Sequence, residues 1–481
     1  MNFKAKVLSE AEIERIHRHS LRLLSEVGVR YNSEKALRIL ESHGAKVDWE
    51  ARLARIPAEL VDQAISSAPK AFVLGARNPA YNLVLPAGES RFCIDGTAAF
   101  AIDFYTGERR YGTREDNENG LRVFQEMDLG WMAWAPTTAS DAPAGTRALH
   151  EFFTMIKFCS KHGQHELHTV EQVPYLVEGL KAVLGDESAI KARQEYSLIY
   201  CPVAPLAHEE AMLEAYLELG ELGMPVMTMP MPVCGSTGPA SVFSNICLAN
   251  AESLSAIVVF ELARPGRAIV YNNATGIMDF MSGAYLGGVP EMGLMSAGLI
   301  EMGRFYGLPT GSAGCTADAK EPGPQAVLEK LITTLPPVLL GADIIAGTGE
   351  IESDQALVLE QLVVDNEIGH FCRRIAQGID SSPEVDLLDD IVEVGPGGHY
   401  LKLKSTRRAA RSGEFYISRL LPHGAYEAWE EAGRPDIYSH ARRIVSEILE
   451  GPVKDPLPES VAGRLDEILQ VADRELGSRE S

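Results

Sequence analysis

The sequence lacks the long apolar run, the paired cysteines and the excess of cations that mark three large classes of protein. No segment reaches the ~20 apolar residues of a membrane-spanning helix, and the densest stretch, residues 255–263, is followed by Arg264 and Pro265. The seven cysteines have no C-x-x-C spacing, which excludes a disulfide framework or a zinc ribbon. Lys and Arg number 44 against 67 Asp and Glu, and a net charge of −23 repels nucleic acid. We therefore expect neither a membrane nor a nucleic-acid partner.

The first residues, MNFKAKVLSEAEIERIHRH, carry scattered charges and no apolar stretch typical of a secretory signal, so a cytoplasmic location is expected. The chain has 481 residues, of which 46% are hydrophobic and 23% charged, as in ordinary globular proteins. That length predicts two or three domains, or one large barrel with an appendage.

Two regions precede the predicted barrel. Residues 1–70 read as an N-terminal helical segment, because Ser9 and Glu12 have capping-box spacing and Gly28 stands where a helix would stop. Residues 71–128 contain short strand-like runs broken by Gly and Pro, which predict a hairpin region that covers the barrel.

Residues 129–400 alternate short apolar runs with longer helical segments, a pattern typical of a (β/α)₈ TIM barrel in the α/β class. The runs begin near Trp131, His165, Ser197, Pro225, Ala268, Leu308, Ala342 and Asp390. Helices are expected between them, at residues 209–223, 239–263, 325–340 and 354–378, and a C-terminal helical extension follows at 401–481. A doubly wound open sheet is the alternative, but no G-x-G-x-x-G follows any strand.

In such a barrel the reacting groups lie just after the strands, at the C-terminal mouth. The residues at these positions are rich in aromatic side chains, glycine and sulfur and poor in cations. Aromatic faces attract quaternary ammonium groups, so this mouth favours a bulky, weakly solvated and cationic ligand.

Two histidine motifs allow a functional and a purely structural interpretation. His162, His165 and His168 have a spacing that gathers metal ligands on a helix, but on a strand it places neighbours on opposite faces, so no metal site is expected. Instead, one histidine of the three is expected to reach the mouth. The Gly-rich segment that ends in His399 either cradles an anion with backbone amides or forms a tight turn.

Several local patterns, taken together, resemble the trimethylamine methyltransferase family of corrinoid-dependent methyltransferases. The similarity extends over most of the chain. The patterns are Asp95-Gly-Thr-Ala98, Asp103-Phe-Tyr-Thr-Gly107, Thr113-Arg-Glu-Asp116, the segments 232–239 and 250–252, Tyr306-Gly-Leu-Pro309, the segment 316–320, Gly341-Ala-Asp343 and Gly395-Pro-Gly-Gly398.

The resemblance implies a TIM barrel that transfers a methyl group to cobalt. The family's trimethylamine enzymes insert pyrrolysine near the segment that matches residues 315–320, whereas this sequence has only the twenty ordinary residues. The members without pyrrolysine act on quaternary amines, so the implied reaction moves a methyl group from a quaternary amine, with glycine betaine first, to Co(I). No histidine here has Asp two residues before it, so the D-x-H-x-x-G mark of a cobalamin-binding domain is absent from the sequence. The corrinoid should therefore come free or on a partner protein, with none tightly bound, and we also expect a homo-oligomer.

The expected substrate contacts lie at the strand ends, and no catalytic side chain is required, because Co(I) is itself a strong nucleophile. The ring of Tyr200 or Tyr271 should face the ammonium group, and one of His165, His168 and His399 should face a substrate carboxylate. Other substrate contacts are expected from Trp134, Gly314, Cys315 and Glu350, with Phe92, Asp95, Phe100 and Tyr105 at the rim.

Two other functions remain open from the sequence. One is a non-catalytic module that binds betaine or docks a corrinoid protein, and the other is a metal-dependent TIM-barrel hydrolase that uses the histidines.

Overall fold

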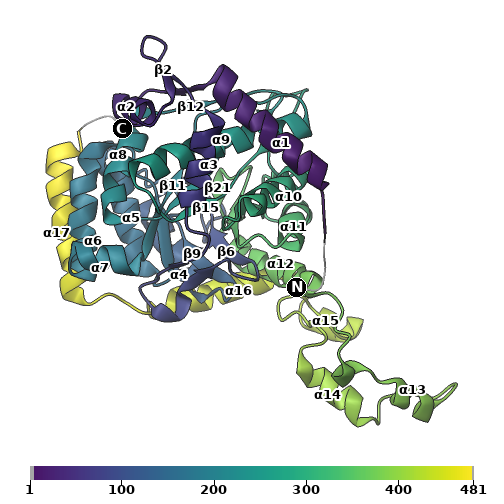
Figure 1. Ribbon diagram of the computed structural model, residues 1–481. Helices are drawn as coiled ribbons and strands as arrows, with labels where there is room; N and C mark the ends of the chain where they lie inside the picture. The colour runs from purple at the N-terminus through teal and green to yellow at the C-terminus, as the bar shows by residue number, and fades with distance from the viewer. Residues whose placement is uncertain (1–4, 479–481) are drawn as a thin grey trace.

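The computed structural model describes residues 5–478. Eight parallel strands form one curved sheet, and a parallel bridge between Tyr271 and Thr310 joins its two edges into a barrel. The fold is therefore the expected α/β TIM barrel, with helices around the strands (Figure 1). In order around the barrel the strands are β6 (Arg91–Ile94), β9 (Gly130–Ala133), β10 (His162–His165), β11 (Tyr196–Tyr200), β13 (Val226–Thr228), β15 (Ile269–Tyr271), β18 (Gly311–Ala313) and β19 (Ile344–Thr348).

The first and last strands of the barrel differ from the prediction. The barrel opens with β6, which lies in the region expected to hold only hairpins. The run near Asp390, expected as the eighth strand, is the helix α13 (Leu388–Val394), whose first turn carries Asp389 and Asp390. Acidic side chains stabilise the N-terminal turn of a helix through its dipole. The prediction was based on the apolar residues of this run and did not take that effect into account. The prediction of a strand there is wrong.

Helices of the barrel follow their strands and cover its outside (Figure 1). The four helices expected between strands all form, although α12 begins five residues later than predicted. The helices that cover the barrel are α4 (Arg114–Glu126), α5 (Arg147–Phe158), α6 (Val173–Leu184), α7 (Glu187–Arg193), α8 (Glu210–Leu219), α9 (Val242–Ala263), α10 (Pro290–Phe305), α11 (Pro324–Leu339) and α12 (Leu359–Gln377).

By length and composition α9 resembles a membrane span, but 94% of its most apolar window is buried inside the structure. It is a core helix, covered by the N-terminal helices α1 (Glu10–Arg22), α2 (Glu34–Ser42) and α3 (Ala58–Ser67). Ser20 of α1 donates a hydrogen bond to the carbonyl of Cys247 on α9, 3.0 Å away. The expected capping box of Ser9 and Glu12 is present. This region also contains a small sheet made of β1 (Val29–Tyr31), β2 (Lys46–Asp48), β3 (Leu53–Arg55) and β12 (Ala207–His208).

The predicted hairpins lie at opposite ends of the barrel. The pair β4 (Phe72–Leu74) and β5 (Leu83–Leu85) contacts the N-terminal end, where the amide of Gly75 donates to the carbonyl of Gln194. The pair β7 (Phe100–Ile102) and β8 (Arg109–Tyr111) lies at the mouth and joins β20 (Glu350–Ile351) and β21 (Ala356–Leu357) in a four-stranded sheet. A second sheet at the mouth consists of β14 (Val233–Cys234), β16 (Gly276–Met278) and β17 (Tyr285–Leu286).

The C-terminal region is helical, as expected. The helix α16 (Ile437–Glu450) packs on α12 and α4, and α17 (Glu459–Leu476) packs on α6. Between α12 and α16 the chain leaves the body in a protruding segment that contains α13, α14 (Lys404–Ser412) and α15 (Tyr426–Glu431) (Figure 1).

Candidate functional site

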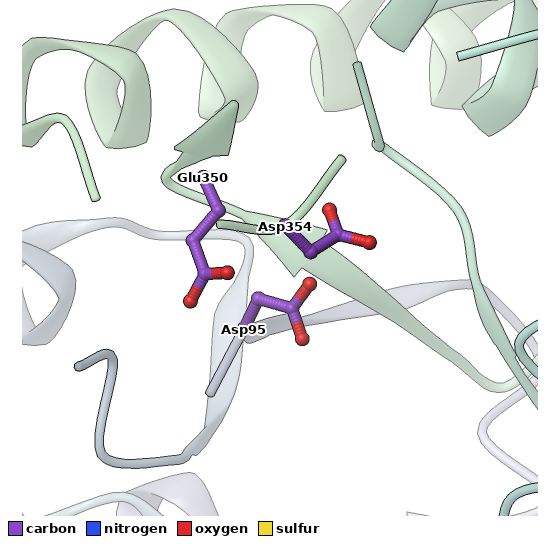
Figure 2. Close-up of side chains that lie close together, drawn as sticks. All are labelled: Asp95, Glu350 and Asp354. Atoms are coloured by element: carbon purple, nitrogen blue, oxygen red, sulfur yellow. The ribbon is translucent and has the colours of Figure 1, made fainter. Parts of the chain in front are cut away.

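Three carboxyl groups meet at the C-terminal mouth of the barrel. Asp95 directly follows β6, Glu350 opens β20 just after β19, and Asp354 lies in the turn between β20 and β21. One oxygen from each carboxyl lies within 4.8 Å of the others, and the three side chains lie close together in Figure 2. We call this set the acid cluster. Its place after two adjacent barrel strands is where TIM-barrel enzymes bind and convert their substrates.

In the acid cluster Asp95 and Glu350 are buried and Asp354 is half-buried, and the carboxyl oxygens are poorly paired. Glu350 is 0% exposed, and neither of its carboxyl oxygens has a hydrogen-bond partner within residues 5–478. Oδ1 of Asp354 also has no partner in that range, whereas Asp95 accepts the amide of Gly96 at 3.0 Å. Buried carboxylates without partners are costly, so this arrangement fits a cationic occupant.

Burial also changes the protonation of the acid cluster. It raises the pKa of Asp95 to about 6, although the amide of Gly96 and the charge of Lys330 act in the opposite direction. Burial and the neighbouring acids raise the pKa values of Glu350 and Asp354 well above their usual range. The acid cluster therefore keeps its protons to higher pH than exposed carboxyls do, and a bound cation would displace part of them.

The turn that carries Asp354 has an unusual backbone. Glu352, Ser353 and Asp354 have φ angles of 63°, 57° and 61°, a left-handed conformation that non-glycine residues seldom adopt in succession. The amides of Glu352 and Ser353 bond to the carbonyls of Ala319 and Ala317, at 2.9 and 2.7 Å. Strain held in place by surrounding bonds is typical of functional sites.

A buried ion pair supports the loops beneath the acid cluster. Nζ of Lys330, on α11, lies 2.9 Å from Oδ2 of Asp365 on α12, and both side chains are fully buried. Lys330 also donates to the carbonyls of Cys315 and Gly347, at 2.5 and 2.9 Å, and Asp365 accepts the amide of Gly349 at 2.7 Å. The pair thus holds the ends of β18 and β19 and places a positive charge near the three carboxyls.

Two aromatic side chains adjoin the acid cluster. The indole of Trp134 lies against Gly96, so closely that a Cβ atom there would come within 2.1 Å of the ring. Tyr285 packs on Gly276 in the same way, with 2.3 Å to its ring. Burial raises the pKa of the Tyr285 hydroxyl, and the charges of Asp354, Asp318 and Asp95 raise it further. These rings are the aromatic side chains that the structure brings to the carboxyls.

Further polar atoms at the strand ends lack partners in the described part of the chain. They are Nε1 of Trp134 after β9, Oε1 of Gln164 on β10, both amide atoms of Asn272 and Oδ1 of Asn273 after β15. All of these side chains are buried. Buried polar groups in native proteins are normally satisfied, so this set suits a polar ligand that supplies both a donor and acceptors.

The structure does not bring Tyr200 and Tyr271 to the acid cluster. The Tyr200 hydroxyl bonds Nδ1 of His208 at 2.7 Å, and its ring packs on Tyr216 and Phe260 of α8 and α9. The Tyr271 hydroxyl donates to Oδ1 of Asn250 on α9 at 2.7 Å. Both rings therefore face the helices outside the barrel, contrary to the expectation that one of them faces the ammonium group. Alternate residues of a strand face opposite sides of the sheet, which explains the difference.

The histidines also lie apart from one another. Nε2 of His165 lies 3.1 Å from Oε2 of Glu151, and its ring contacts Phe152, so it faces α5. His162 is buried, with its ring nitrogens bonded to the Gly75 carbonyl and the Ser197 hydroxyl. His168 is partly buried in the loop after β10. The three histidines of this row therefore have separate surroundings.

The remaining predicted residues divide between the mouth and other places. Asp95 and Glu350 form the acid cluster, and Phe100 and Tyr105 belong to the mouth hairpin, where Tyr105 is 74% exposed. The other four predicted positions lie away from the carboxyls. Phe92 packs against Gly369 of α12, Gly314 lies against Ile345 and the Thr333 carbonyl, Cys315 is buried beside Lys330, and His399 is exposed on the protruding segment.

Sequence reasoning missed Asp354, Tyr285 and Lys330. Asp354 was expected to begin a helix, and its signal is the run of acids at 350, 352 and 354 after an apolar strand. Lys330 is a single charged residue on the apolar face of a helical pattern. A charged residue at a buried position indicates that it has a partner there. Nothing in the sequence around Tyr285 points to the mouth.

Comparison with known proteins gives similarity over the full length. The chain is 30% identical to the trimethylamine methyltransferase MttB of Desulfitobacterium hafniense strain DSM 10664 / DCB-2, over 98% of this chain and 94% of that protein. It is 32% identical to MttB2 of Methanosarcina mazei, over 96% and 94%. It is also 30% identical to a glycine betaine methyltransferase of D. hafniense strain Y51, over 98% of each.

Among solved structures, the monomethylamine methyltransferase MtmB of Methanosarcina barkeri aligns with a TM-score of 0.49 at 14% identity, over 93% of this chain and 90% of that one. The family model of trimethylamine methyltransferase (MTTB) matches residues 2–477. The chain therefore belongs to the trimethylamine methyltransferase (MTTB) family.

Proposed function

We propose that this chain transfers a methyl group from a quaternary amine, glycine betaine first, to Co(I) of a corrinoid carried by a partner protein. The observation that carries the proposal is the acid cluster. Three poorly paired carboxyls after two adjacent barrel strands, two of them buried and one half-buried, form a site for a permanent cation. The similarity to a glycine betaine methyltransferase at 30% identity supports the same substrate class.

The reaction does not require a covalent bond between the protein and the substrate. The electron pair of Co(I) attacks the N-methyl carbon, a carbon–cobalt bond forms, and the carbon–nitrogen bond breaks as its electron pair stays on the amine. Alignment of donor and acceptor and exclusion of water are then the main contributions of the barrel. Among its residues, Asp95, Glu350 and Asp354 hold the ammonium group, and the Trp134 and Tyr285 rings shield it.

The raised pKa values of the acid cluster support a second role for it in the reaction. The substrate nitrogen loses its charge during methyl transfer, so three fully ionised carboxylates would bind the substrate more tightly than the transition state. Retained protons reduce that penalty. A protonated carboxyl of the acid cluster also passes its proton to the lone pair of the departing tertiary amine, which restores a cation beside a carboxylate.

A carboxylate on the substrate would need hydrogen-bond donors outside the acid cluster. Nε1 of Trp134 and Nδ2 of Asn272 are buried donors that have no partner within residues 5–478. Trp134 follows β9 and Asn272 follows β15, so they lie on either side of the strands that carry the acids. Carboxyls flanked by hydrogen-bond donors support a zwitterionic substrate over a simple amine.

The surroundings of the mouth support a macromolecular partner. Large apolar side chains are exposed on the loops that follow β6, β11, β13 and β15, where a protein that carries the corrinoid would dock. They are Tyr105 at 74%, Val203 at 49%, Met231 at 42%, Phe280 at 70% and Met281 at 94%.

A binding panel tests the choice of substrate. Glycine betaine, proline betaine, carnitine, choline and trimethylamine are compared by thermal shift, where a ligand at 100 times its dissociation constant adds about 2.7 kcal/mol to the free energy of unfolding. Quaternary amines with a carboxylate should raise the melting temperature more than choline does. Stabilisation by trimethylamine with no effect of any betaine would contradict the proposal.

The affinity for a quaternary amine should rise with pH through about 6, the pKa of Asp95. The raised pKa values of Asp95, Glu350 and Asp354 keep protons on the acid cluster at low pH, and a cation binds better after they leave. Each proton released on binding is worth up to about tenfold in affinity per pH unit. Calorimetry with glycine betaine between pH 5.5 and 8, in two buffers of different ionisation enthalpy, measures both the affinity and the protons released.

The ligand-free protein supplies the matching control. A carboxyl whose folded pKa is raised favours the folded state while protonated, so the contribution of Asp95 to the free energy of unfolding should fall as the pH rises through about 6. Bound glycine betaine should reduce that fall. An affinity that is flat over this range, with no proton release, would show that the acid cluster does not hold the cation.

A divalent metal ion is the second candidate occupant, because three carboxyls within 4.8 Å also suit such an ion. It would favour the metal-dependent hydrolase. Metal analysis of the purified protein, together with activity after chelation, distinguishes the methyltransferase from the metal-dependent hydrolase. Binding of betaine without any cobalt methylation would instead favour a non-catalytic binding module.

A further inference from the structure

A helical arm projects from the body of the protein without a core of its own. The arm comprises residues 380–412, with α13, α14 and the Gly-rich turn 395–398 between them (Figure 1). None of its residues is buried. Gly395 and Gly397 have φ angles of 64° and 82°, as a tight turn requires, so the structure favours the turn interpretation of this motif. Helices as short as α13 and α14 are only marginally stable in water unless they pack against something.

Charge is separated along the arm. Residues 380–393 contain six acidic side chains and no basic one, whereas residues 402–411 contain five basic side chains and no acidic one. On α14 the four cations Lys404, Arg407, Arg408 and Arg411 have i, i+3, i+4 and i+7 spacing, which places them on one face. None of these eleven charged side chains forms an ion pair in the described part of the chain, although Arg408 donates a hydrogen bond to the backbone carbonyl of Glu384 at 3.2 Å. The acidic carboxylates and the basic side chains of the arm are therefore left for a partner.

An apolar stripe accompanies the acidic residues. Leu388, Ile391 and Val392 share one face of α13 and are 62%, 56% and 74% exposed. Leu401, just before α14, is 77% exposed. Soluble proteins seldom leave such a stripe uncovered at the tip of an extended segment.

We propose that the arm pairs with the same arm of a second copy of this chain, the acidic α13 of each copy against the basic α14 of the other. A twofold interface places the same surface on both partners, and an arm with one acidic and one basic half is complementary to itself in that arrangement. The rest of the molecule gives no general attraction between copies, since each carries a net charge of −23. The matching charges and the apolar stripe favour a second copy of the arm over a partner protein whose surface carries charges of only one sign.

Charge reversal on the full chain tests the pairing. Light scattering after size-exclusion chromatography should give the unmodified protein an even number of chains. Arg407→Glu with Arg411→Glu should halve the measured mass, and Asp389→Lys with Glu393→Lys should do the same, because each change places like charges opposite one another. The four changes together restore the match in reversed order, so the original mass should return.

A matched control reverses two arginines with the same spacing on another exposed helix. Arg18 and Arg22 on α1 are four residues apart and exposed, so Arg18→Glu with Arg22→Glu should leave the mass unchanged. Circular dichroism checks that every variant is folded. A single-chain mass for the unmodified protein, an unchanged mass after reversal of either helix, or failure of the fourfold variant to reassociate would each overturn the proposal. These outcomes do not depend on the methyl-transfer reaction.

Discussion

Changing Glu350 to glutamine is expected to lower the rate of cobalt methylation about a hundredfold, the lower end of what proton transfer by a positioned side chain contributes. Glu350 is 0% exposed, and its carboxyl oxygens have no partner within residues 5–478, so it is the member of the acid cluster most available to a ligand. The amide has nearly the same shape but neither balances a cation nor releases a proton. Steady-state rates with glycine betaine and a Co(I) corrinoid measure the effect.

The stability of this variant separates a functional role from a structural one. Because an amide avoids burial of a charge, the melting temperature of Glu350→Gln should equal or exceed that of the unmodified protein. The matched control is Glu367→Gln on α12, a buried acid that accepts a hydrogen bond from the Tyr416 hydroxyl at 2.8 Å, and it should retain activity. Full activity in Glu350→Gln would contradict the role given to the acid cluster.

Changing Lys330 to methionine is expected to lower the free energy of unfolding by about 3–5 kcal/mol, the usual result of removing one partner of a buried ion pair. The change leaves Asp365 charged and fully buried, and it removes the donor from the carbonyls of Cys315 and Gly347. Chemical denaturation with circular dichroism measures the loss.

A double change tests the cause of that loss. Lys330→Met with Asp365→Leu removes both charges, so it should recover part of the stability that the single change loses. Lys35 on α2 is exposed, and Lys35→Met serves as the control, with an expected change within about 0.5 kcal/mol. If Lys330→Met denatures like the unmodified protein, the ion pair does not hold the ends of β18 and β19.

Much of the fold could be predicted because several barrel strands are short apolar runs followed by a helix, although β10 (HGQH) and β18 (GSA) are not apolar. The run Arg91-Phe-Cys-Ile94 was predicted as a hairpin strand and not as the barrel strand β6, because its pairing with β19 and β9 is not visible in the local sequence. The run near Asp390 shows the opposite error, since five residues of mixed character suit a strand or a short helix equally well.

The candidate site was predictable in position but only partly in identity. Glu350 follows a predicted barrel strand, so the barrel rule places it at the mouth, whereas Asp95 follows β6 and was expected at the rim. Tyr200 and Tyr271 also end strands, but those strands are buried on both faces, and no alternation of polar residues reveals which side chains point inward. Asp354 reaches the site through a left-handed turn, and Lys330 acts through a partner 35 residues away, neither of which local patterns disclose.

Cobalt methylation in a defined mixture tests the central claim most directly. The purified chain is combined with a Co(I) corrinoid, free or protein-bound, and glycine betaine, and the absorbance change from Co(I) to methyl-Co(III) is followed with the substrate omitted as the control. We predict methylation only in the complete mixture, with dimethylglycine formed in equal amount. Demethylation of trimethylamine while every betaine is ignored, or turnover without any corrinoid, would contradict the account.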